Sequence, residues 1–272
     1  MVQNLKFNPF DCVAMGLYTA SNLVLQWEFI MDTEQLVEKL ISWIRDKVLA
    51  AGCKGVVVGM SGGLDSSVLA VLCHRAFPQS MFGVLMPCHS SQEDEEHALA
   101  VASKFSIPTK TVVLDAVFNT LVKVLPGDKA ESTVSRLAKG NFKVRLRMLT
   151  LYYFANQLKY MVAGPSNRSE LSAGYFTKYG DGGVDILPLG NLVKGQVREL
   201  ASFLGIPQQI IDKPPSAGLW LGQTDEDELG LSYEELDRYL VTGKASNELR
   251  AKIESMIAAS SHKRMPPPVA NF

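Results

Sequence analysis

KGVVVGMSGGLDSSVLAVLCHRAF, residues 54–77, is the stretch that decides the fold. Its apolar run Val56–Val58 is typical of a strand that is buried on both faces, as in a parallel sheet. Gly59–Gly63 then interrupts the apolar run, and from Asp65 onward apolar residues recur at the spacing of one helix face. The sequence therefore predicts a strand, a glycine-rich turn and a helix, in that order.

The turn between this strand and this helix has the features of an anion site. A helix N-terminus leaves backbone N–H groups unpaired, its dipole favours negative charge, and adjacent glycines let a ligand approach the main chain. Ser61, Ser66 and Ser67 add hydroxyl donors. The turn differs from the G-x-x-x-x-G-K-[ST] phosphate loop, because Asp65 stands where that loop has its lysine. A carboxylate repels phosphate unless a cation lies between them, so we expect a bridging Mg²⁺.

The composition narrows the class of protein. The 272 residues are enough for one large domain or two small ones, and 47% hydrophobic with 20% charged residues is typical of a globular protein with a sizeable core. A net charge of −1 gives no sign of a nucleic-acid partner or a membrane partner. The four cysteines form no C-x-x-C pair, and Cys73 falls on the apolar face of its predicted helix. This usage indicates a buried free thiol and a cytoplasmic location.

Residues 1–30 differ in character from the rest of the chain. They lack the charged start and compact apolar centre of a secretory signal, and the continuous apolar run of about 20 residues that a membrane span needs. At Met31 the character changes, and Asp32–Gln35 opens an amphipathic helix. We therefore expect 1–30 to be an N-terminal extension and 31–272 to be a single domain. An N-terminal arm that docks on the domain fits the pattern equally well.

Strand and helix patterns alternate after the opening unit. We predict strands at 81–86, 111–114 and 160–163, and helices at 92–105, 116–125 and 140–158. Such alternation predicts an α/β fold with a doubly wound parallel sheet and helices on both of its faces. Ligands of these sheets bind outside the carboxyl ends of the strands, at a switch in strand order. His89 and His97 stand apart from any metal-ligand pattern, and we expect both on the surface.

The second half of the chain adds charged side chains to this edge of the sheet. Glu170 follows the predicted strand 160–163, so it and Asp65 should lie at one sheet edge and share a hard cation that also holds phosphate oxygens. In the predicted helix 140–158, Lys143 and Arg147 share a face, whereas Arg145 points elsewhere. The segment 174–185 is rich in glycine and aromatic residues, which is typical of a binding loop.

SGGLDS (61–66) resembles the SGGxDS loop of the N-type ATP pyrophosphatases, which split ATP into AMP and pyrophosphate while they adenylate a substrate. Together with further motifs it resembles the NAD synthetase family, whose members amidate nicotinic acid adenine dinucleotide (deamido-NAD). The resemblance runs from Met31 to Lys263 and is strongest in GNFKVRLRM, SNRSE, GYFTKYGDGGVDILPLG, LVKGQVREL, KPPSAGLWLGQTDEDELGLSYEELD and SHKR. It implies the doubly wound fold, ATP beneath the glycine-rich loop, and a homodimer with the dinucleotide at its interface.

The resemblance also implies roles for individual residues. Asp65 and Glu170 match Mg²⁺ ligands, Lys194 matches a lysine that contacts ATP phosphates, and these three are the expected catalytic residues. The implied ATP site consists of Gly59, Met60, Ser61, Gly62, Gly63, Leu64, Asp65, Ser66, Pro165, Lys194 and Ser216. The implied deamido-NAD site consists of Arg145, Lys178, Asp185, His262 and Lys263. The family usually has Thr in place of Pro165, which has neither a hydroxyl nor an N–H, and Ser166 is the neighbouring hydroxyl that could substitute.

The reaction that the resemblance implies is the ATP-dependent amidation of deamido-NAD to NAD through an acyl-adenylate, with release of AMP and pyrophosphate. Adenylation gives the carboxylate a good leaving group, and the positive charge of Mg²⁺ and Lys194 screens the two anions that must meet. We expect free ammonia as the nitrogen donor. Relatives that use glutamine carry an additional amidase domain, whereas only about 53 residues precede the first predicted strand here.

Three other arrangements fit parts of the pattern. A separate glutaminase subunit could supply the ammonia. Another N-type pyrophosphatase, such as a tRNA-thiolating or GMP-forming ligase, shares the SGGLDS loop, but the thiolating kind should carry cysteines in matched loops, which Cys53, Cys73 and Cys88 do not provide. A non-catalytic nucleotide sensor is a third alternative, although sensing would not require both Asp65 and Glu170.

Overall fold

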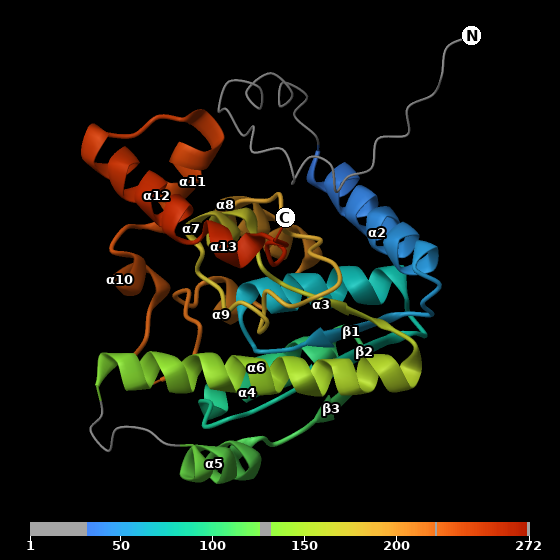
Figure 1. Cartoon of the computed structure of the whole chain (residues 1–272). Helices are drawn as coiled ribbons and strands as arrows, with labels where there is room; N and C mark the ends of the chain where they lie inside the picture. The colour runs from blue at the N-terminus through green and yellow to red at the C-terminus, as the bar shows by residue number, and fades with distance from the viewer. Residues whose placement is uncertain (1–31, 126–131, 221, 271–272) are drawn as a thin grey trace.

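Four parallel strands form the sheet at the centre of the computed structural model, which describes residues 32–125, 132–220 and 222–270 (Figure 1). The strands lie in the order β3-β2-β1-β4, with bounds Val56–Gly59 (β1), Met81–Leu85 (β2), Thr109–Thr111 (β3) and Met161–Ala163 (β4). Every pairing between neighbouring strands is parallel. The chain winds from β1 outward to β3 and then returns to the other side of β1, so β1 is the strand at which the order switches.

The two faces of the sheet belong to two separate hydrophobic cores. Val56 and Val58 of β1 face the first core, together with α2 (Thr33–Ala50), α3 (Leu64–Ala76), α4 (Gln92–Lys104) and α8 (Lys194–Leu204). Val57, between them, faces the second core under α5 (Asp115–Val124) and α6 (Thr133–Leu158). Figure 1 shows α6 crossing in front of the strands. Because helices cover both faces, the predicted doubly wound α/β fold is confirmed.

A third, smaller cluster packs beside the edge of the sheet where the strands end. It joins α7 to the C-terminal helices through residues such as Leu236 and Ile253, which are fully buried. The remaining helices are α7 (Arg168–Ala173), α9 (Gln208–Ile211), α10 (Asp225–Leu229), α11 (Tyr233–Thr242), α12 (Asn247–Ala259) and α13 (Ser261–Arg264). None of the helices in the described ranges is long and apolar enough to cross a membrane.

Two element boundaries and one surface residue differ from the sequence expectations. The long helix begins at Thr133 and not at Gly140, because the Ser132 hydroxyl caps it by accepting from the Ser135 N–H at 3.1 Å. The third strand is Thr109–Thr111 and not 111–114, since Gly83–Leu85 of β2 pairs with those residues. His97 was expected on the surface but is only 7% exposed. Helix α2 begins at Thr33 as expected, while the expected extension 1–30 lies outside the described residues.

Candidate active site

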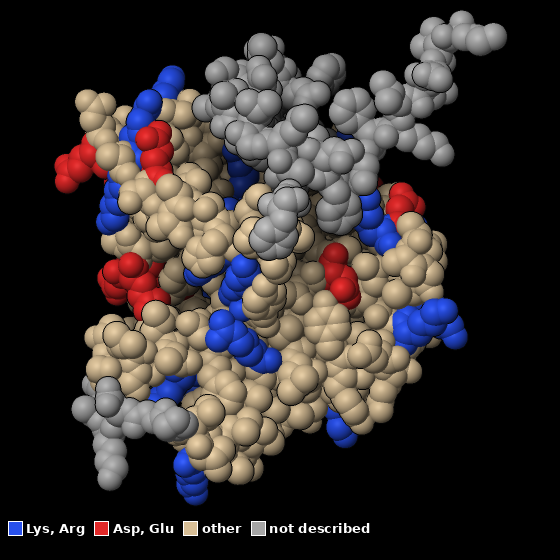
Figure 2. Space-filling view, in the orientation of Figure 1, with Lys and Arg blue, Asp and Glu red and all other residues tan. Residues whose placement is uncertain are grey.

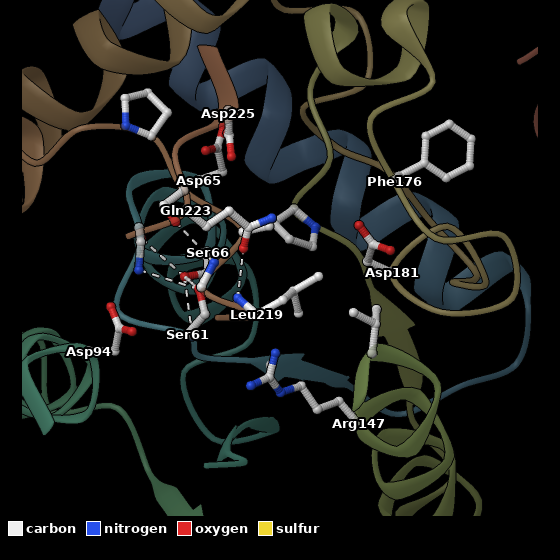
Figure 3. Close-up of a pocket in the computed structure, with 18 of the residues that line it drawn as sticks. Ser61, Asp65, Ser66, Asp94, Arg147, Phe176, Asp181, Leu219, Gln223 and Asp225 are labelled. Atoms are coloured by element: carbon white, nitrogen blue, oxygen red, sulfur yellow. Dashed lines mark hydrogen bonds between the residues drawn. The ribbon is translucent and has the colours of Figure 1, made fainter. Parts of the chain in front are cut away.

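The carboxyl ends of β1 and β4 open into a cavity of about 850 Å³ (Figure 3). The chain leaves β1 toward α3 and leaves β4 toward α7, so the two connections diverge and leave a crevice between them. The cavity is also lined by α6 and by the segment that follows α9. This is the position at which the sequence predicted a ligand site.

The glycine-rich turn is shaped by close packing against α4. Gly62 has a φ of +80°, and a Cβ on it would lie 2.1 Å from the Asp94 carbonyl oxygen. Only glycine fits such a position without displacing the backbone. The hydroxyls of Ser66 and Ser67 both donate to the Gly63 carbonyl, at 3.0 and 2.8 Å. These two serines therefore brace the turn, and all of residues 59–66 except Gly62 line the cavity.

Asp65, Glu170 and Lys194 meet in one cluster at the end of the sheet. The Lys194 Nζ lies 2.5 Å from Asp65 Oδ2 and 3.3 Å from Glu170 Oε1. Their side chains are 13%, 14% and 6% exposed in the order Asp65, Glu170, Lys194. The structure thus brings together the three residues predicted to be catalytic, and it places the lysine ammonium between the two carboxylates.

Backbone contacts hold this cluster from both sides. Asn167 caps α7: its side chain accepts from the Glu170 N–H, the Glu170 carboxylate accepts from the Asn167 N–H, and the Asn167 Nδ2 donates to Asp65 at 2.8 Å. Lys194 is the first residue of α8, and its N–H donates to Ser169 Oγ at 3.1 Å. Ser169 in turn donates to Asp237 at 2.5 Å. The charged groups are therefore positioned by the N-termini of three helices, α3, α7 and α8.

Burial and mutual charge shift the protonation of this cluster. Burial, with the neighbouring Asp65 carboxylate, raises the pKa of Glu170 to about 8. Burial alone would lower the pKa of Lys194, but the carboxylates of Asp65 and Glu170 outweigh burial and raise it. Two buried carboxylates that already share one cation are a suitable donor set for Mg²⁺, whose preferred ligands are carboxylate, phosphate and water oxygens.

Of the five residues expected to bind deamido-NAD, one lines the cavity and four do not. Lys263 lines the cavity, where its Nζ donates to the carbonyls of Gly174 and Phe176. The other four, Arg145, Lys178, Asp185 and His262, do not line it. Arg145 donates to the Lys178 carbonyl at 3.3 Å, and the Lys178 Nζ donates to the His262 carbonyl at 2.5 Å.

Asp185 is held separately from these basic residues. It accepts from the Val162 N–H at 2.8 Å and from the Tyr152 hydroxyl at 2.9 Å.

Figure 2 shows Lys and Arg side chains in the middle of this face of the molecule, between α13 and α6 as labelled in Figure 1.

The remaining predicted ATP residues do line the cavity. Pro165 and Ser216 are both part of its wall, and so is Ser166, which is 2% exposed.

On α6, the predicted common face of Lys143 and Arg147 is confirmed. Lys143 donates to the Leu219 carbonyl at 2.9 Å, and Arg147 donates to the Met86 carbonyl at 3.2 Å.

Two acids in the cavity wall, one partly and one fully buried, had no role in the sequence prediction. Asp181 accepts from the Thr177 N–H, and burial raises its pKa to about 6. Asp225 is 4% exposed: its Oδ2 accepts from the Tyr233 hydroxyl at 3.0 Å, and its Oδ1 has no hydrogen-bond partner in the described part of the chain. In the sequence, Asp225 belongs to the acidic run DEDE, which is equally typical of a solvated first helical turn.

The comparisons with known proteins identify the family of the chain. The family model "NAD synthase" matches residues 36–267. The chain is 49% identical over 241 residues to the NH(3)-dependent NAD(+) synthetase of Syntrophomonas wolfei subsp. wolfei, covering 88% of this chain and 97% of that protein. It is similar to the NMN synthetase of Francisella tularensis (TM-score 0.83, 35% identity, 89% of this chain and 100% of that one). It is also similar to the NH3-dependent NAD synthetase of Campylobacter jejuni subsp. jejuni in complex with the nitrate ion (TM-score 0.72, 30% identity, 89% and 100%).

Proposed function

The chain belongs to the NAD synthase family, and from this premise we propose that it is an ammonia-dependent NAD synthetase. It uses ATP to amidate deamido-NAD with ammonia and releases AMP and pyrophosphate. The observation that carries this function is the convergence of a glycine-rich helix N-terminus, two carboxylates and a lysine in one cavity at the switch point of the sheet.

The geometry fits the first half of such a reaction. The turn 59–66 offers helix N-terminal N–H groups to phosphate oxygens, and Lys194 supplies a buried positive charge beside them. Asp65 and Glu170 would hold Mg²⁺, which when bound neutralises the phosphate charge that develops on the departing pyrophosphate.

The second half of the reaction joins ammonia to the activated carboxylate. The nitrogen lone pair forms the C–N bond, the bond to the AMP oxygen breaks, and AMP leaves with that electron pair. The nitrogen then gives up one proton to water, which leaves the neutral amide. No side chain of the protein has to form a covalent bond with the substrate. This chemistry requires that water be excluded from the activated carboxylate, because water competes with ammonia for the same carbonyl carbon.

We assign the dinucleotide to the interface of a homodimer. The support is that Arg145, Lys178, Asp185 and His262 lie outside the cavity, so a ligand that reached them would have to extend beyond it. Leu149 and Tyr153, on the outer face of α6, are 69% and 59% exposed, which suits contact with a second copy of the chain. Free thiols at Cys53, Cys73 and Cys88 suit a reducing compartment such as the cytoplasm.

A second candidate substrate follows from the similarity to an NMN synthetase. That protein shares the fold at a TM-score of 0.83, above the value for the Campylobacter jejuni NAD synthetase. The same adenylation and amidation would act on a nicotinic acid mononucleotide, whose carboxylate is identical. The identity of 49% to an NH(3)-dependent NAD(+) synthetase favours the dinucleotide.

One assay separates these possibilities. The purified chain is given ATP and Mg²⁺ with deamido-NAD or with nicotinic acid mononucleotide, and with ammonium chloride or glutamine, and pyrophosphate and amide are both measured. We expect amide from the dinucleotide with ammonium chloride. Asp65→Asn and Glu170→Gln should each nearly abolish pyrophosphate release. Comparable rates with glutamine in a glutaminase-free preparation would contradict the proposal that ammonia is the nitrogen donor. Faster amidation of the mononucleotide than of the dinucleotide would show that the mononucleotide is the preferred substrate.

A further inference from the structure

Asp237 joins the two helices that carry Glu170 and Lys194. It lies on α11, which packs against both α7 and α8 (Figure 1). Its Oδ1 accepts from the Ser169 hydroxyl at 2.5 Å, and its Oδ2 accepts from the Gly195 N–H at 2.8 Å. Ser169 directly precedes Glu170 on α7. Gly195 directly follows Lys194 on α8. One carboxylate therefore connects the two points from which these side chains extend to the cluster.

The start of α8 depends on this connection, because its own cap residue cannot provide an acceptor. The N-cap position is Val193, whose side chain has no oxygen for the first N–H groups of the helix. The N–H of Lys194 donates instead to Ser169 Oγ at 3.1 Å, and the N–H of Gly195 donates to Asp237. The dipole of α8 also favours a negative charge at this end. Residues of α7 and α11 thus cap α8.

The Ser169 hydroxyl transmits this contact. It is 0% exposed, it donates to Asp237, and it accepts from the Lys194 N–H. An ionised carboxylate can only accept, so Asp237 fixes the direction of both hydrogen bonds. Without this carboxylate, the Ser169 hydroxyl and the Gly195 N–H would each lose their acceptor. Buried polar groups without a partner are costly, so we expect α7 and α8 to shift until they find new partners.

The same face of α11 also contacts the Lys194 side chain. Tyr233 precedes Asp237 by four residues, which places both on one side of the helix. The centroid of the Tyr233 ring lies 5.1 Å from Lys194 Nζ. Asp237 itself is not among the described residues that line the cavity. Any effect of Asp237 on the reaction must therefore act through the groups that it holds.

We propose that Asp237 is a positioning residue for adenylation: it holds α7 and α8 at the spacing that places Glu170 and Lys194 beside Asp65. The proposal rests on the ATP-dependent reaction proposed above. A displacement of about 1 Å at a reacting group can lower the rate about 100-fold, even when its cause lies away from the chemistry. The hydrophobic cluster of the C-terminal helices, to which α11 belongs, thus supports the geometry of the active site as well as its own packing.

The test is the steady-state rate of pyrophosphate release by the purified full chain with ATP, Mg²⁺, deamido-NAD and ammonium chloride. In Asp237→Ala, kcat should fall on the order of 10- to 100-fold while the KM for ATP changes by less than about threefold, because the displaced charges act mainly on the transition state. Asp237→Asn should lose less, since its amide oxygen can still accept from Gly195 while its NH₂ group donates to Ser169 Oγ.

Two further variants separate positioning from a loss of stability. Leu236→Val removes one methylene from the fully buried neighbour of Asp237 and should keep the wild-type kcat, although it weakens the packing of the same helix. In the Lys194→Ala background, Asp237→Ala should lower kcat by a smaller factor than in wild type, because the group that it positions is gone. If Asp237→Ala does not fold, Ser169→Ala breaks the same connection and should give the same loss of kcat.

The outcomes distinguish this role from the proposed function. Wild-type protein that releases no pyrophosphate with deamido-NAD would refute the proposed function, and the positioning role with it. With an active wild type, an unchanged kcat in Asp237→Ala would overturn the role of Asp237. So would a loss of rate that comes entirely from a raised KM for ATP, an equal loss in Leu236→Val, or an equal factor in the Lys194→Ala background.

Discussion

Replacing Glu170 with glutamine should remove a pH-dependent loss of stability from the ligand-free protein. Glu170 has an ordinary pKa of 4.5 and a folded-state pKa raised to about 8, because it is buried beside Asp65. Between these two values the folded protein holds a proton that the unfolded chain has released. Stability from this group is therefore complete below about pH 4.5 and is lost as the pH rises through about 8. At roughly 1.4 kcal/mol per pH unit, the whole interval corresponds to about 5 kcal/mol.

The measurement is urea unfolding of wild type and Glu170→Gln from pH 5 to pH 9, without nucleotide or Mg²⁺. The free energy of unfolding of the variant minus that of wild type should increase by up to about 1.4 kcal/mol per pH unit to pH 8 and then level off. Other raised carboxyls, such as Asp181, titrate in both proteins and cancel in this difference. Glu234→Gln, at an exposed site, should show no such slope. A difference that does not change with pH would show that Lys194 keeps Glu170 ionised throughout.

Three further changes test the turn, the lysine and the N-terminus. Lys194→Ala should lower kcat more than it raises the KM for ATP, because its charge acts on phosphate that is leaving; an unchanged kcat with a raised KM would indicate ground-state binding only. Gly62→Ala should weaken ATP binding and destabilise the protein by more than the matched variant Gly52→Ala. Gly52 has a similar φ of +68°, but an added Cβ would meet open space there, so that substitution should cost only about 1–2 kcal/mol. Equal losses of stability in denaturant titrations would refute the clash with Asp94. Deleting residues 1–30 should leave a folded, active enzyme by circular dichroism and by the amide assay, and unfolding on truncation would identify a structural arm.

The parts of the site that the sequence predicted are those set by local pattern and by one topological rule. The buried run before Gly59 and the helical spacing after Asp65 are local signals, and both elements form as expected. Glu170 lies more than a hundred residues later, yet its place beside Asp65 follows because parallel strands end at the same sheet edge. Lys143 and Arg147 share a face because their spacing matches the helical repeat.

The parts that the sequence did not predict depend on long-range packing. The resemblance assigned Lys194 to ATP phosphates, but its pairing with Asp65, 129 residues away, depends on how α8 packs against α3. The sequence analysis assigned no role to Asp225, since an acidic run at a helix N-terminus has the same pattern whether or not it faces a cavity. His97, in contrast, had a local signal that was missed, because it lies four residues before Val101 and therefore on the buried face of α4.

The ligand-free cluster has to be stable before any substrate arrives, and its geometry explains how. Buried acidic groups without a cation nearby would destabilise the fold, so Lys194, which contacts Asp65 and Glu170, serves as a resident counter-ion. The backbone N–H of Lys194 donates to Ser169 Oγ at the start of α8, which fixes the point from which the side chain extends to the carboxylates. Because Asp65 and Glu170 are already largely buried and held in place, a divalent cation bound there would find its ligands pre-arranged, and binding energy would be left for orienting the phosphates.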